Sequence, residues 1–371
     1  MRDIVIVGGG LAGLVASAML AEEGLDVLVI EKGEYPFHRV CGEYISNEVL
    51  PFLKEKGLYP EHLKPAKLTR FQLTAVNGAK VNMPLDLGGF GVSRYELDNF
   101  LYSCAKERGA TFKLKTQVSN ISRNKDHFLV HLGGDQVESA RIVIGSFGKR
   151  TKLDKQLDRA FIKKRSPYIG VKYHLEADYP NDLIALHNFK GGYCGVSCVE
   201  KNIVNLCYLS EAANLKKYGD IATMEKEILW QNPELRKVLG NAKVLFDKPK
   251  VINEISFARK ELVQDGILMV GDAAGMITPL CGNGMAIAIH GAKILSELLI
   301  EFFRKESYTK TQLERDYISR WKKHFATRLW AGRKIQGLFG NNGVSNFAVG
   351  LAKTSEPIAR FLMSKTHGQP F

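Results

Sequence analysis

Three glycines near the start of the chain, Gly8, Gly10 and Gly13, have the G-x-G-x-x-G spacing of a nucleotide-binding turn. The first permits a tight turn, the second lets the backbone approach a pyrophosphate, and the third lets a helix pack closely on a strand. The helix start offers N–H groups and a positive dipole end to phosphates. Glu31 has the spacing of a carboxylate that accepts hydrogen bonds from ribose hydroxyls. This stretch predicts a dinucleotide site with seven candidate residues: Gly8, Gly10, Leu11, Ala12, Gly13, Glu31 and Lys32.

The elements that must position this turn lie on either side of it. Residues 4–7 form a β-branched run, residues 14–23 are rich in Ala and Leu, and residues 27–30 form a second apolar run. We therefore predict a strand, a glycine turn, a helix and a second strand. A secretory signal peptide is the alternative, because Arg2 precedes an uncharged stretch over residues 4–21. The glycine spacing and the second strand favour the nucleotide site.

A second motif, G-D-A-A-G at residues 271–275, follows an apolar run near the other end of the chain. Its acid, Asp272, comes off a strand, where a carboxylate can accept hydrogen bonds from polyol hydroxyls. Gly282 and Gly284 then open a long apolar helix. A flavin needs both features, because its ribityl chain carries hydroxyls and its reduced ring carries negative charge. An ordinary strand-to-helix turn is the alternative. Together the two motifs predict FAD, with further candidates Gly271, Asp272, Gly282, Asn283, Gly284 and Met285.

The composition is that of an ordinary soluble globular protein, with 45% hydrophobic and 25% charged residues among 371. This length is sufficient for two or three domains with buried cores. No stretch gives some ~18 consecutive apolar residues after the first motif, so we expect no membrane-spanning helix. The cysteines occur without C-x-x-C pairs, which favours a reducing, cytoplasmic location and argues against a structural zinc site. We predict no metal site.

The net charge is +13, and residues 301–371 contain 13 Lys and Arg against 5 Asp and Glu. No nucleic-acid-binding module accompanies this charge, so we expect no nucleic-acid partner. In the same region Trp321 and Phe325 share a helical face, with Trp330 about 140° round from Phe325. Peripheral contact with an anionic membrane surface is one interpretation of this basic C-terminal region. A solvated basic face, with the rings packed in the core against the antiparallel sheet domain, is the other.

The chain order predicts three structural parts. Strand-like runs at residues 168–175, 183–189, 193–199 and 203–209 indicate an antiparallel sheet, shared with a hairpin that turns at Asn77-Gly78. We also predict a helix from about Glu43 to Leu53. The fold class is α/β (α+β overall), a Rossmann-like FAD-binding domain with a discontinuous antiparallel β-sheet substrate domain and a C-terminal helical region. The predicted boundaries are 1–65, 91–165 and 257–305 for the FAD-binding domain, 66–90 and 166–256 for the substrate domain, and 306–371 for the helical region.

Four features together resemble the FAD-dependent p-hydroxybenzoate hydroxylase superfamily. They are the glycine turn with Glu31, the Asp272 motif with its following glycines, Pro36-x-x-Arg39-x-Cys41-Gly42-Glu43, and Arg94-x-x-x-Asp98-x-x-Leu101. Within this superfamily the chain is most similar to the geranylgeranyl reductase branch. That similarity rests on Cys41-Gly42-Glu43-x-Ile45-Ser46, Gly192-Tyr193 and Tyr317-x-x-x-Trp321. The resemblance covers residues 1–330.

The resemblance implies roles for individual residues. Arg39 and Cys41-Gly42 would pass beside the flavin ring and ribityl chain, and Arg94 would reach the phosphate–ribityl region. Two alternatives stay open: Arg94 could instead pair with Asp98 on its own helix, and Cys41 could be inert packing.

For the two ends of the cofactor, the resemblance implies that Val118 supplies backbone contacts to the adenine. It also implies that Asp272 holds the ribityl and pyrophosphate groups, and that residues 282–285 lie at the pyrimidine end of the ring.

The chain departs from the family pattern at two places. Phe147 stands where the aromatic hydroxylases carry the acid of an Asp-Gly pair, which puts direct reduction by NAD(P)H in doubt and leaves the electron donor unknown. The family's Gly-Tyr-x-Trp strand has Gly195 in place of its Trp, which indicates either more room over the flavin or a different substrate shape. The halogenase motif W-x-W-x-I-P is absent from the sequence, which argues against halogenation.

The leading hypothesis is an FAD-dependent oxidoreductase that exchanges a hydride or two electrons with an apolar, unsaturated (isoprenoid, lipid or polyketide-like) substrate. Cys41 and Tyr193 are the candidate catalytic groups. Cys281 could approach Cys41 and form a redox-sensitive pair. A flavin monooxygenase that hydroxylates an aromatic or polyketide-like substrate is the first alternative. A non-catalytic flavin-fold binding protein is the second.

Overall fold

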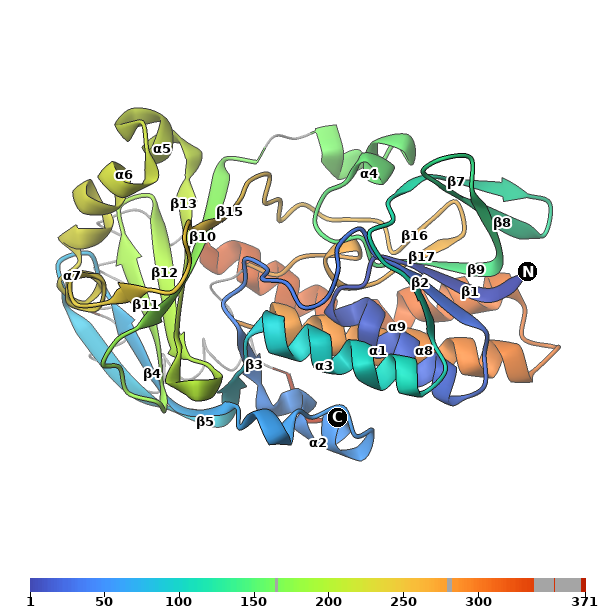
Figure 1. Ribbon diagram of the computed structural model, residues 1–371, viewed down its shortest axis with the longest axis horizontal. Coiled ribbons are helices and arrows are strands. Elements are labelled where there is room, and N and C mark those ends of the chain that lie inside the picture. Colours follow the sequence, from blue (N-terminus) through green and yellow to red (C-terminus); the bar gives the residue numbers. More distant parts are fainter. Residues whose placement is uncertain (164–165, 279–281, 337–349, 351–367) are drawn as a thin grey trace.

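A computed structural model describes residues 1–163, 166–278, 282–336, 350 and 368–371. Two β-sheets lie at opposite ends of its long axis, each with its own helices (Figure 1). The first is rich in parallel strands and the second is largely antiparallel, so the predicted mixed α/β class is confirmed.

The first sheet contains the predicted nucleotide-binding unit. Its main path runs β16-β17-β9-β1-β2-β6, and β8 with β7 continues from β9. β1 pairs in parallel with both β2 and β9, as a doubly wound sheet requires. Its strands have the following bounds: β1 Arg2–Val7, β2 Val27–Ile30, β6 Thr111–Lys113, β7 Val118–Asn124, β8 His127–Leu132, β9 Val137–Gly145, β16 Val263–Gln264 and β17 Ile267–Met269.

Four long helices pack on the first sheet and bury it. Parallel strands need cover on both faces, and the β1 residues Ile4 to Val7 are accordingly all buried. The helix that follows the glycine turn, α1, is buried along almost its whole length. The four helices are α1 Leu11–Glu22, α3 Arg94–Glu107, α8 Gly284–Arg304 and α9 Lys310–Gln336. Among the described residues, no helix combines the length and apolar character needed to cross a bilayer.

The second sheet confirms the predicted antiparallel strands and the hairpin. Its path is β14-β10-β13-β12-β11-β4-β5-β3, and β15 also pairs with β10. The hairpin joins the other strands through a parallel pairing of β4 with β11. Its strands have the following bounds: β3 Tyr44–Ser46, β4 Ala66–Thr74, β5 Lys80–Gly91, β10 Tyr168–Glu176, β11 Leu183–Phe189, β12 Gly192–Cys198, β13 Val204–Glu211, β14 Lys243–Val244 and β15 Lys250–Ile252.

Within the described ranges, short helices cover one face of the second sheet. Alternate residues of β10, β12 and β13 pack there in a core with residues from α6, α7 and η5. The other face, which carries Tyr193 and Leu209, is turned toward the first sheet and its helices (Figure 1). The remaining helices are α2 Leu50–Glu55, α4 Lys152–Gln156, α5 Ala212–Tyr218, α6 Ile221–Glu227, α7 Pro233–Gly240, and the 3₁₀ helices η1 Asn47–Val49, η2 Glu61–Leu63, η3 Ala160–Lys163, η4 Glu200–Asn202, η5 Leu229–Gln231 and η6 Gly271–Ala273.

The predicted helix from Glu43 to Leu53 begins later than expected. Glu43 has a left-handed backbone with φ of +55°, which an α-helix cannot accommodate. Tyr44 to Ser46 then form β3, which pairs with the end of β5. The α-helix itself starts at Leu50. Tertiary pairing thus overrides the local helical pattern over the first residues of this stretch.

Helix α9 carries Trp321, Phe325 and Trp330, three aromatic residues of the basic region. Phe325 is fully buried and Trp321 is nearly so, and both belong to the core that includes α1 and α8. Trp330 is 52% exposed. Trp321 and Phe325 are therefore packed in a core, but in that of the first sheet and its helices and not, as the interpretation had it, against the antiparallel sheet. The predicted C-terminal region extends to residue 371, and residues 337–349 and 351–367 lie outside the described residues.

We predict that Phe325→Ala destabilises the protein by about 3–5 kcal/mol, because it removes a large side chain from a closed core. Trp330→Ala is the matched control, since an aromatic ring on the exposed side of the same helix should change stability by less than about 0.5 kcal/mol. Equilibrium urea unfolding of both variants measures the difference. Equal effects would contradict the assignment of the two faces of α9.

Candidate functional site

One continuous cavity of about 910 Å³ lies between the first sheet and the face of the second that carries Tyr193. It extends from the glycine turn after β1, past the segment Arg39–Glu43, to the strands of the second sheet. The structure therefore brings together residues from both ends of the sequence. Both catalytic candidates line this cavity, and so do all the cofactor-binding candidates except Gly13 and Asn283.

The glycine turn has the geometry that the spacing predicts. Gly8 has φ of +104°, and a Cβ there would lie 2.3 Å from the Ser146 carbonyl oxygen. A Cβ on Gly13 would lie 2.3 Å from the Gly8 carbonyl oxygen, so Gly13 serves helix packing and not the cavity wall. By contrast, a Cβ on Gly10 would meet no atom within 4 Å, and Gly10 lines the cavity. The open space at Gly10, at the N-terminus of α1, fits a pyrophosphate.

Glu31 lies at the end of β2 with its carboxylate held by two backbone groups. The N–H of Gly9 donates to Oε2 at 2.8 Å and the N–H of Gly33 donates to Oε1 at 2.9 Å. Lys32 lines the cavity beside it, and Val118, the first residue of β7, lines the same end. The carboxylate is thus fixed toward the cavity, where its remaining lone pairs can accept hydrogen bonds.

The Asp272 loop is held by a buried arginine that sequence reasoning missed. Arg159 is 1% exposed, forms an ion pair with Asp154 at 2.9 Å, and donates to the Ala273 carbonyl oxygen at 2.9 Å. Asp272 itself is exposed and lines the cavity. The Arg159 contacts hold the loop in place, so the Asp272 side chain is not needed for packing and can face the cavity.

Two lysines border Asp272. Lys260 donates to the backbone oxygens of Asp272 at 2.6 Å and of Lys149 at 2.7 Å. Burial lowers the pKa of Lys149 and of Lys260 to about 8, although the Asp272 charge opposes this effect. Lys149 lines the cavity. The cavity therefore has a cationic border close to the Asp272 loop.

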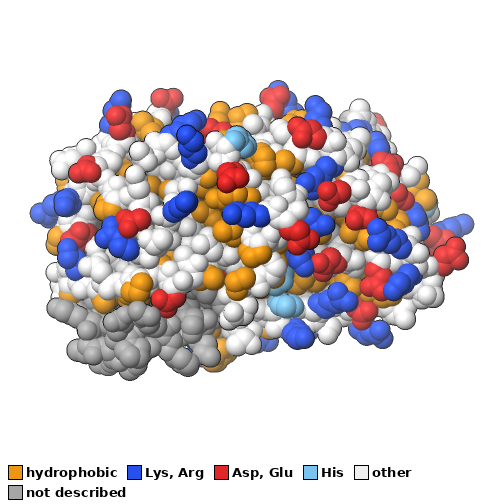
Figure 2. Space-filling model, turned by 90° about the horizontal axis from the view of Figure 1, so that it is seen from below, with side chains coloured by type: hydrophobic (Ala, Val, Ile, Leu, Met, Phe, Trp, Pro, Cys, Tyr) orange, Lys and Arg blue, Asp and Glu red, His pale blue; other side chains and the backbone are white. Residues whose placement is uncertain are grey.

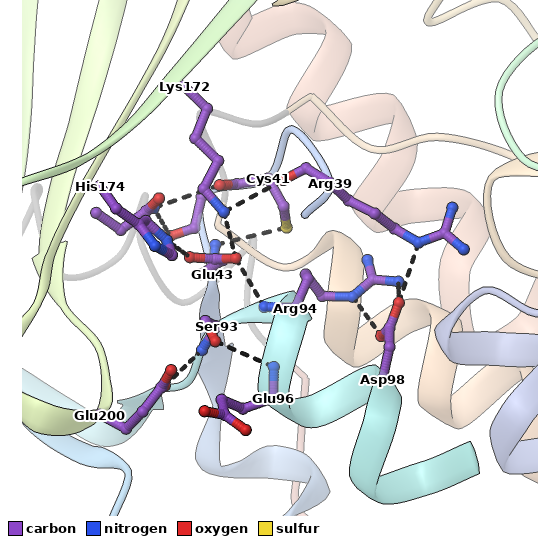
Figure 3. Close-up of polar contacts among 12 residues, drawn as sticks. Arg39, Cys41, Glu43, Ser93, Arg94, Glu96, Asp98, Lys172, His174 and Glu200 are labelled. Atoms are coloured by element: carbon purple, nitrogen blue, oxygen red, sulfur yellow. Dashed lines mark hydrogen bonds and ion pairs between the residues drawn. The ribbon is translucent and has the colours of Figure 1, made fainter. Parts of the chain in front are cut away.

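Arg94 makes the ion pair that the sequence left open as an alternative role. It binds Asp98 in a bidentate manner, with Nε–Oδ1 and Nη2–Oδ2 distances of 2.6 and 2.7 Å. Arg39 also binds Asp98, with an Nε–Oδ2 distance of 3.0 Å (Figure 3). Both arginines line the cavity. The Asp98 carboxylate thus orients two guanidinium groups at its edge.

Glu43 is the centre of a buried charge network that has no counterpart in the sequence analysis. Its carboxylate pairs with Lys172 Nζ, hydrogen-bonds His174 Nε2 at 2.7 Å, and accepts the Arg94 backbone N–H at 2.7 Å (Figure 3). Glu43 and Lys172 have no solvent exposure. Burial alone would raise the pKa of the Glu43 carboxyl, but Lys172 and His174 outweigh it and hold this pKa below its ordinary value.

The second sheet also holds the neighbouring segment that carries Cys41. Lys172 Nζ donates to the Arg39 carbonyl oxygen at 3.2 Å, and Asn205 Nδ2 donates to the Gly42 carbonyl oxygen at 2.8 Å. Burial raises the pKa of the Cys41 thiol, so it is protonated at neutral pH. The predicted partner Cys281 lies outside the described residues.

Tyr193 and Phe147 line the cavity from opposite sides. Tyr193 projects from β12, is 3% exposed, and its hydroxyl donates to Gln336 Oε1 at 3.3 Å. Phe147 follows β9, and it too faces the cavity. Met285, at the start of α8, lies 3.5 Å from the Cys41 sulfur.

Residues 1–314 match the family of FAD binding domains. The chain belongs to this family. The cofactor predicted from the two motifs, FAD, is thereby confirmed at the level of the family.

Individual relatives are distant. The chain is 26% identical over 338 residues to the digeranylgeranylglycerophospholipid reductase of Methanosarcina acetivorans, covering 86% of this chain and 80% of the relative. It is 25% identical to conditioned medium factor receptor 1 of Dictyostelium discoideum, covering 87% of this chain and 68% of the relative. The FAD-binding fold is thus shared by proteins with different names and roles.

Solved structures share the same fold. A geranylgeranyl bacteriochlorophyll reductase-like protein from Thermoplasma acidophilum gives a TM-score of 0.79 at 18% identity, covering 98% of this chain and 95% of that one. The flavin-dependent brominase Bmp2 gives the same TM-score and identity, covering 98% and 93%. At this identity the likeness establishes the architecture and leaves the reaction open.

We predict that Glu43→Gln destabilises the protein by about 3–5 kcal/mol at neutral pH, because it leaves the Lys172 ammonium buried without its counter-charge. The pKa of Glu43 is lowered in the folded protein, so its contribution is full above its ordinary pKa of 4.5 and is lost as the pH falls through the folded value. The difference between wild type and variant should therefore shrink in acid.

Urea unfolding of both proteins at pH 7 and near pH 4 tests this expectation. Glu176→Gln is the control, because Glu176 and Lys243 form an exposed pair at 3.2 Å whose loss should cost about 0–1 kcal/mol. A variant at Glu43 that is as stable as wild type at pH 7 would show that the network does not hold this region.

Proposed function

We propose that the protein is an FAD-dependent oxidoreductase that transfers a hydride or two electrons between bound FAD and an apolar, unsaturated substrate. The observation that carries this proposal is the continuity of the cavity. Its one end is the glycine turn and the Asp272 loop, and its other end is the apolar face of the second sheet. A cofactor and a substrate can therefore share one continuous space.

The residues on the cavity wall fit FAD along its length. Gly10 with the α1 N-terminus would hold the pyrophosphate, Glu31 the ribose, and Val118 the adenine. Asp272 would hold the ribityl hydroxyls, and the start of α8 at Gly284 would lie at the pyrimidine end. When bound, FAD supplies the two-electron chemistry, and the helix start favours negative charge beside it.

The substrate side of the cavity is apolar. Its wall on and beside the second sheet includes these side chains: Phe71, Leu85, Ile184, Leu186, Leu209, Ile252, Ile255 and Met276. Such a wall excludes water and favours hydrocarbon chains or rings. The Methanosarcina relative is named for a lipid substrate, which supports the same substrate class here.

Cys41 and Tyr193 stay the candidate catalytic groups. Each faces the cavity, and the raised pKa of the Cys41 thiol keeps a proton on its sulfur at neutral pH. The Glu43 network holds the Cys41 segment in place. We propose that Cys41 supplies the proton that accompanies hydride transfer when the substrate is reduced, with the hydride adding to one carbon of the double bond and the proton to the other.

The deciding experiment is reduction and reoxidation of the purified protein. Its visible spectrum reports bound FAD, and anaerobic titration with NADH, NADPH and dithionite identifies a donor. Stopped-flow mixing of the reduced protein with oxygen then separates the candidates. A flavin hydroperoxide spectrum would favour the monooxygenase, and its absence favours the reductase. A third outcome would favour a binding protein: dithionite reduces the bound FAD, but the reduced FAD passes no electrons to any apolar acceptor. The relative named as a receptor is consistent with that role.

We predict that Gly10→Val weakens the affinity for FAD by at least ~10-fold, so that the purified protein no longer contains one FAD per chain. The new side chain would occupy the space where the backbone meets the pyrophosphate. Gly133→Val is the matched control, since a Cβ there also meets no atom within 4 Å but Gly133 lies in an exposed turn after β8. The measurement is the flavin-to-protein absorbance ratio after gel filtration. Equal ratios would contradict the placement of the pyrophosphate.

A lipid substrate would also suit peripheral contact with a membrane through the basic C-terminal region. On α9, Lys322 and Lys323 are exposed together with Trp330. The face in Figure 2 has lysine and arginine interspersed with acidic side chains, so it does not present a separate basic patch.

We predict that the protein co-sediments with acidic liposomes and is released by salt, because the attraction is electrostatic. Lys322→Glu with Lys323→Glu should weaken the binding several-fold. Neutral liposomes are the control. Equal sedimentation with acidic and neutral liposomes, or no sedimentation with either, would contradict the proposed membrane contact.

A further inference from the structure

The apolar wall of the cavity crosses the strands of the second sheet. Its side chains come successively from β13, β12, β11, β4 and β5, beginning beside Ile252 of β15. The path from β13 to β5 contains four strand-to-strand steps, and neighbouring strands lie about 4.8 Å apart. The wall is therefore an apolar track of about 19 Å that crosses the strands.

Gly195 lies in the middle of this track. It is the fourth residue of β12, opposite Cys207 of β13 on one side and Leu186 of β11 on the other. All three residues line the cavity. Tyr193, two residues earlier and so on the same face, projects into the cavity, whereas Gly195 leaves that face without a side chain.

The usual structural reasons for a glycine do not apply at this position. Gly195 does not have a positive φ, and the register on both sides of it continues without a bulge. A Cβ would meet only the Cys207 carbonyl oxygen, at an ordinary 3.7 Å. Gly192 in the same strand differs, because a Cβ there would lie 2.1 Å from the Leu209 carbonyl oxygen. The fold requires a glycine at 192 and not at 195.

A glycine inside a strand weakens the strand and often marks a bulge, a tight bend, or the close approach of a ligand or another backbone. At Gly195 the register has no bulge and the neighbouring backbone is at an ordinary distance, so the close approach of a ligand is the remaining reason. We propose that Gly195 is a specificity-determining residue. The missing side chain joins the two halves of the apolar track, so that an extended ligand can lie across the sheet from β13 to β5. Gly195 thereby selects ligands by length, because a side chain at this position would confine a ligand to one half of the track. This inference rests on the proposed function.

The test compares ligands of two lengths in the FAD-bound protein. The probes are geranylgeraniol and its short homologue geraniol, titrated against the change in flavin absorbance and fluorescence. Wild type should bind geranylgeraniol at least ~10-fold more tightly than geraniol. In Gly195→Leu and Gly195→Phe, binding of geranylgeraniol should weaken at least ~10-fold, because a side chain divides the track, while binding of geraniol should stay within about 2-fold.

Two controls keep the outcomes separate. Gly133→Leu places the same side chain on an exposed turn and should bind both probes as wild type does. The flavin-to-protein ratio and the thermal midpoint of each variant report FAD binding and folding, and Gly195→Ala covers the case in which larger variants fail to fold. A wild type without FAD would overturn the proposed function itself. Unchanged discrimination between the probes in folded, FAD-loaded Gly195→Leu would overturn the role of Gly195 alone.

Discussion

A carboxylate without access to water holds the two halves of this molecule together. Glu43 follows the cavity-lining segment, and it is stable in the interior only because Lys172, His174 and the start of α3 surround it with positive charge and donors. These partners come from the second sheet and from a helix of the first. Any displacement of one half relative to the other would expose or unpair a buried charge. The Cys41 segment therefore takes its position from residues of both halves.

Features that depend on a few neighbouring residues could be predicted from the sequence. The turn at Gly8 and Gly13 follows from sterics that act within one strand–helix unit, and the structure shows the close contacts that the spacing implies. The strands from residue 168 to residue 209 were predictable because turn residues separate short β-branched and aromatic runs. The site candidates around Gly10, Glu31 and Asp272 could be predicted in the same way, because each belongs to a short motif of neighbouring residues. The fold brings these motifs to one cavity.

Contacts between remote positions could not be predicted in this way. Glu43 is 129 residues from Lys172, and no local pattern marks the pair. Lys172 and His174 alternate along β10 with buried apolar residues, which is the pattern of a strand with one face in water. The polar face in fact lies against the Arg39–Glu43 segment. Arg159 was missed for the same reason, since its support of the Asp272 loop depends on a contact 114 residues away.

The parallel pairing of β4 with β11 has a consequence for how the chain assembles. Leu183 lies opposite Arg70 in this pairing, and the intervening chain forms much of the first sheet. Arg70 and Leu183 are 113 residues apart, so β4 cannot pair with β11 until that much further chain has been synthesised and the two strands have been brought together. Such non-local pairing makes folding slow, because the chain loses the entropy of loop closure before the contacts that stabilise the closed loop can form. Neither sheet is a contiguous piece of chain, so the second one could not be excised as an independently folding fragment.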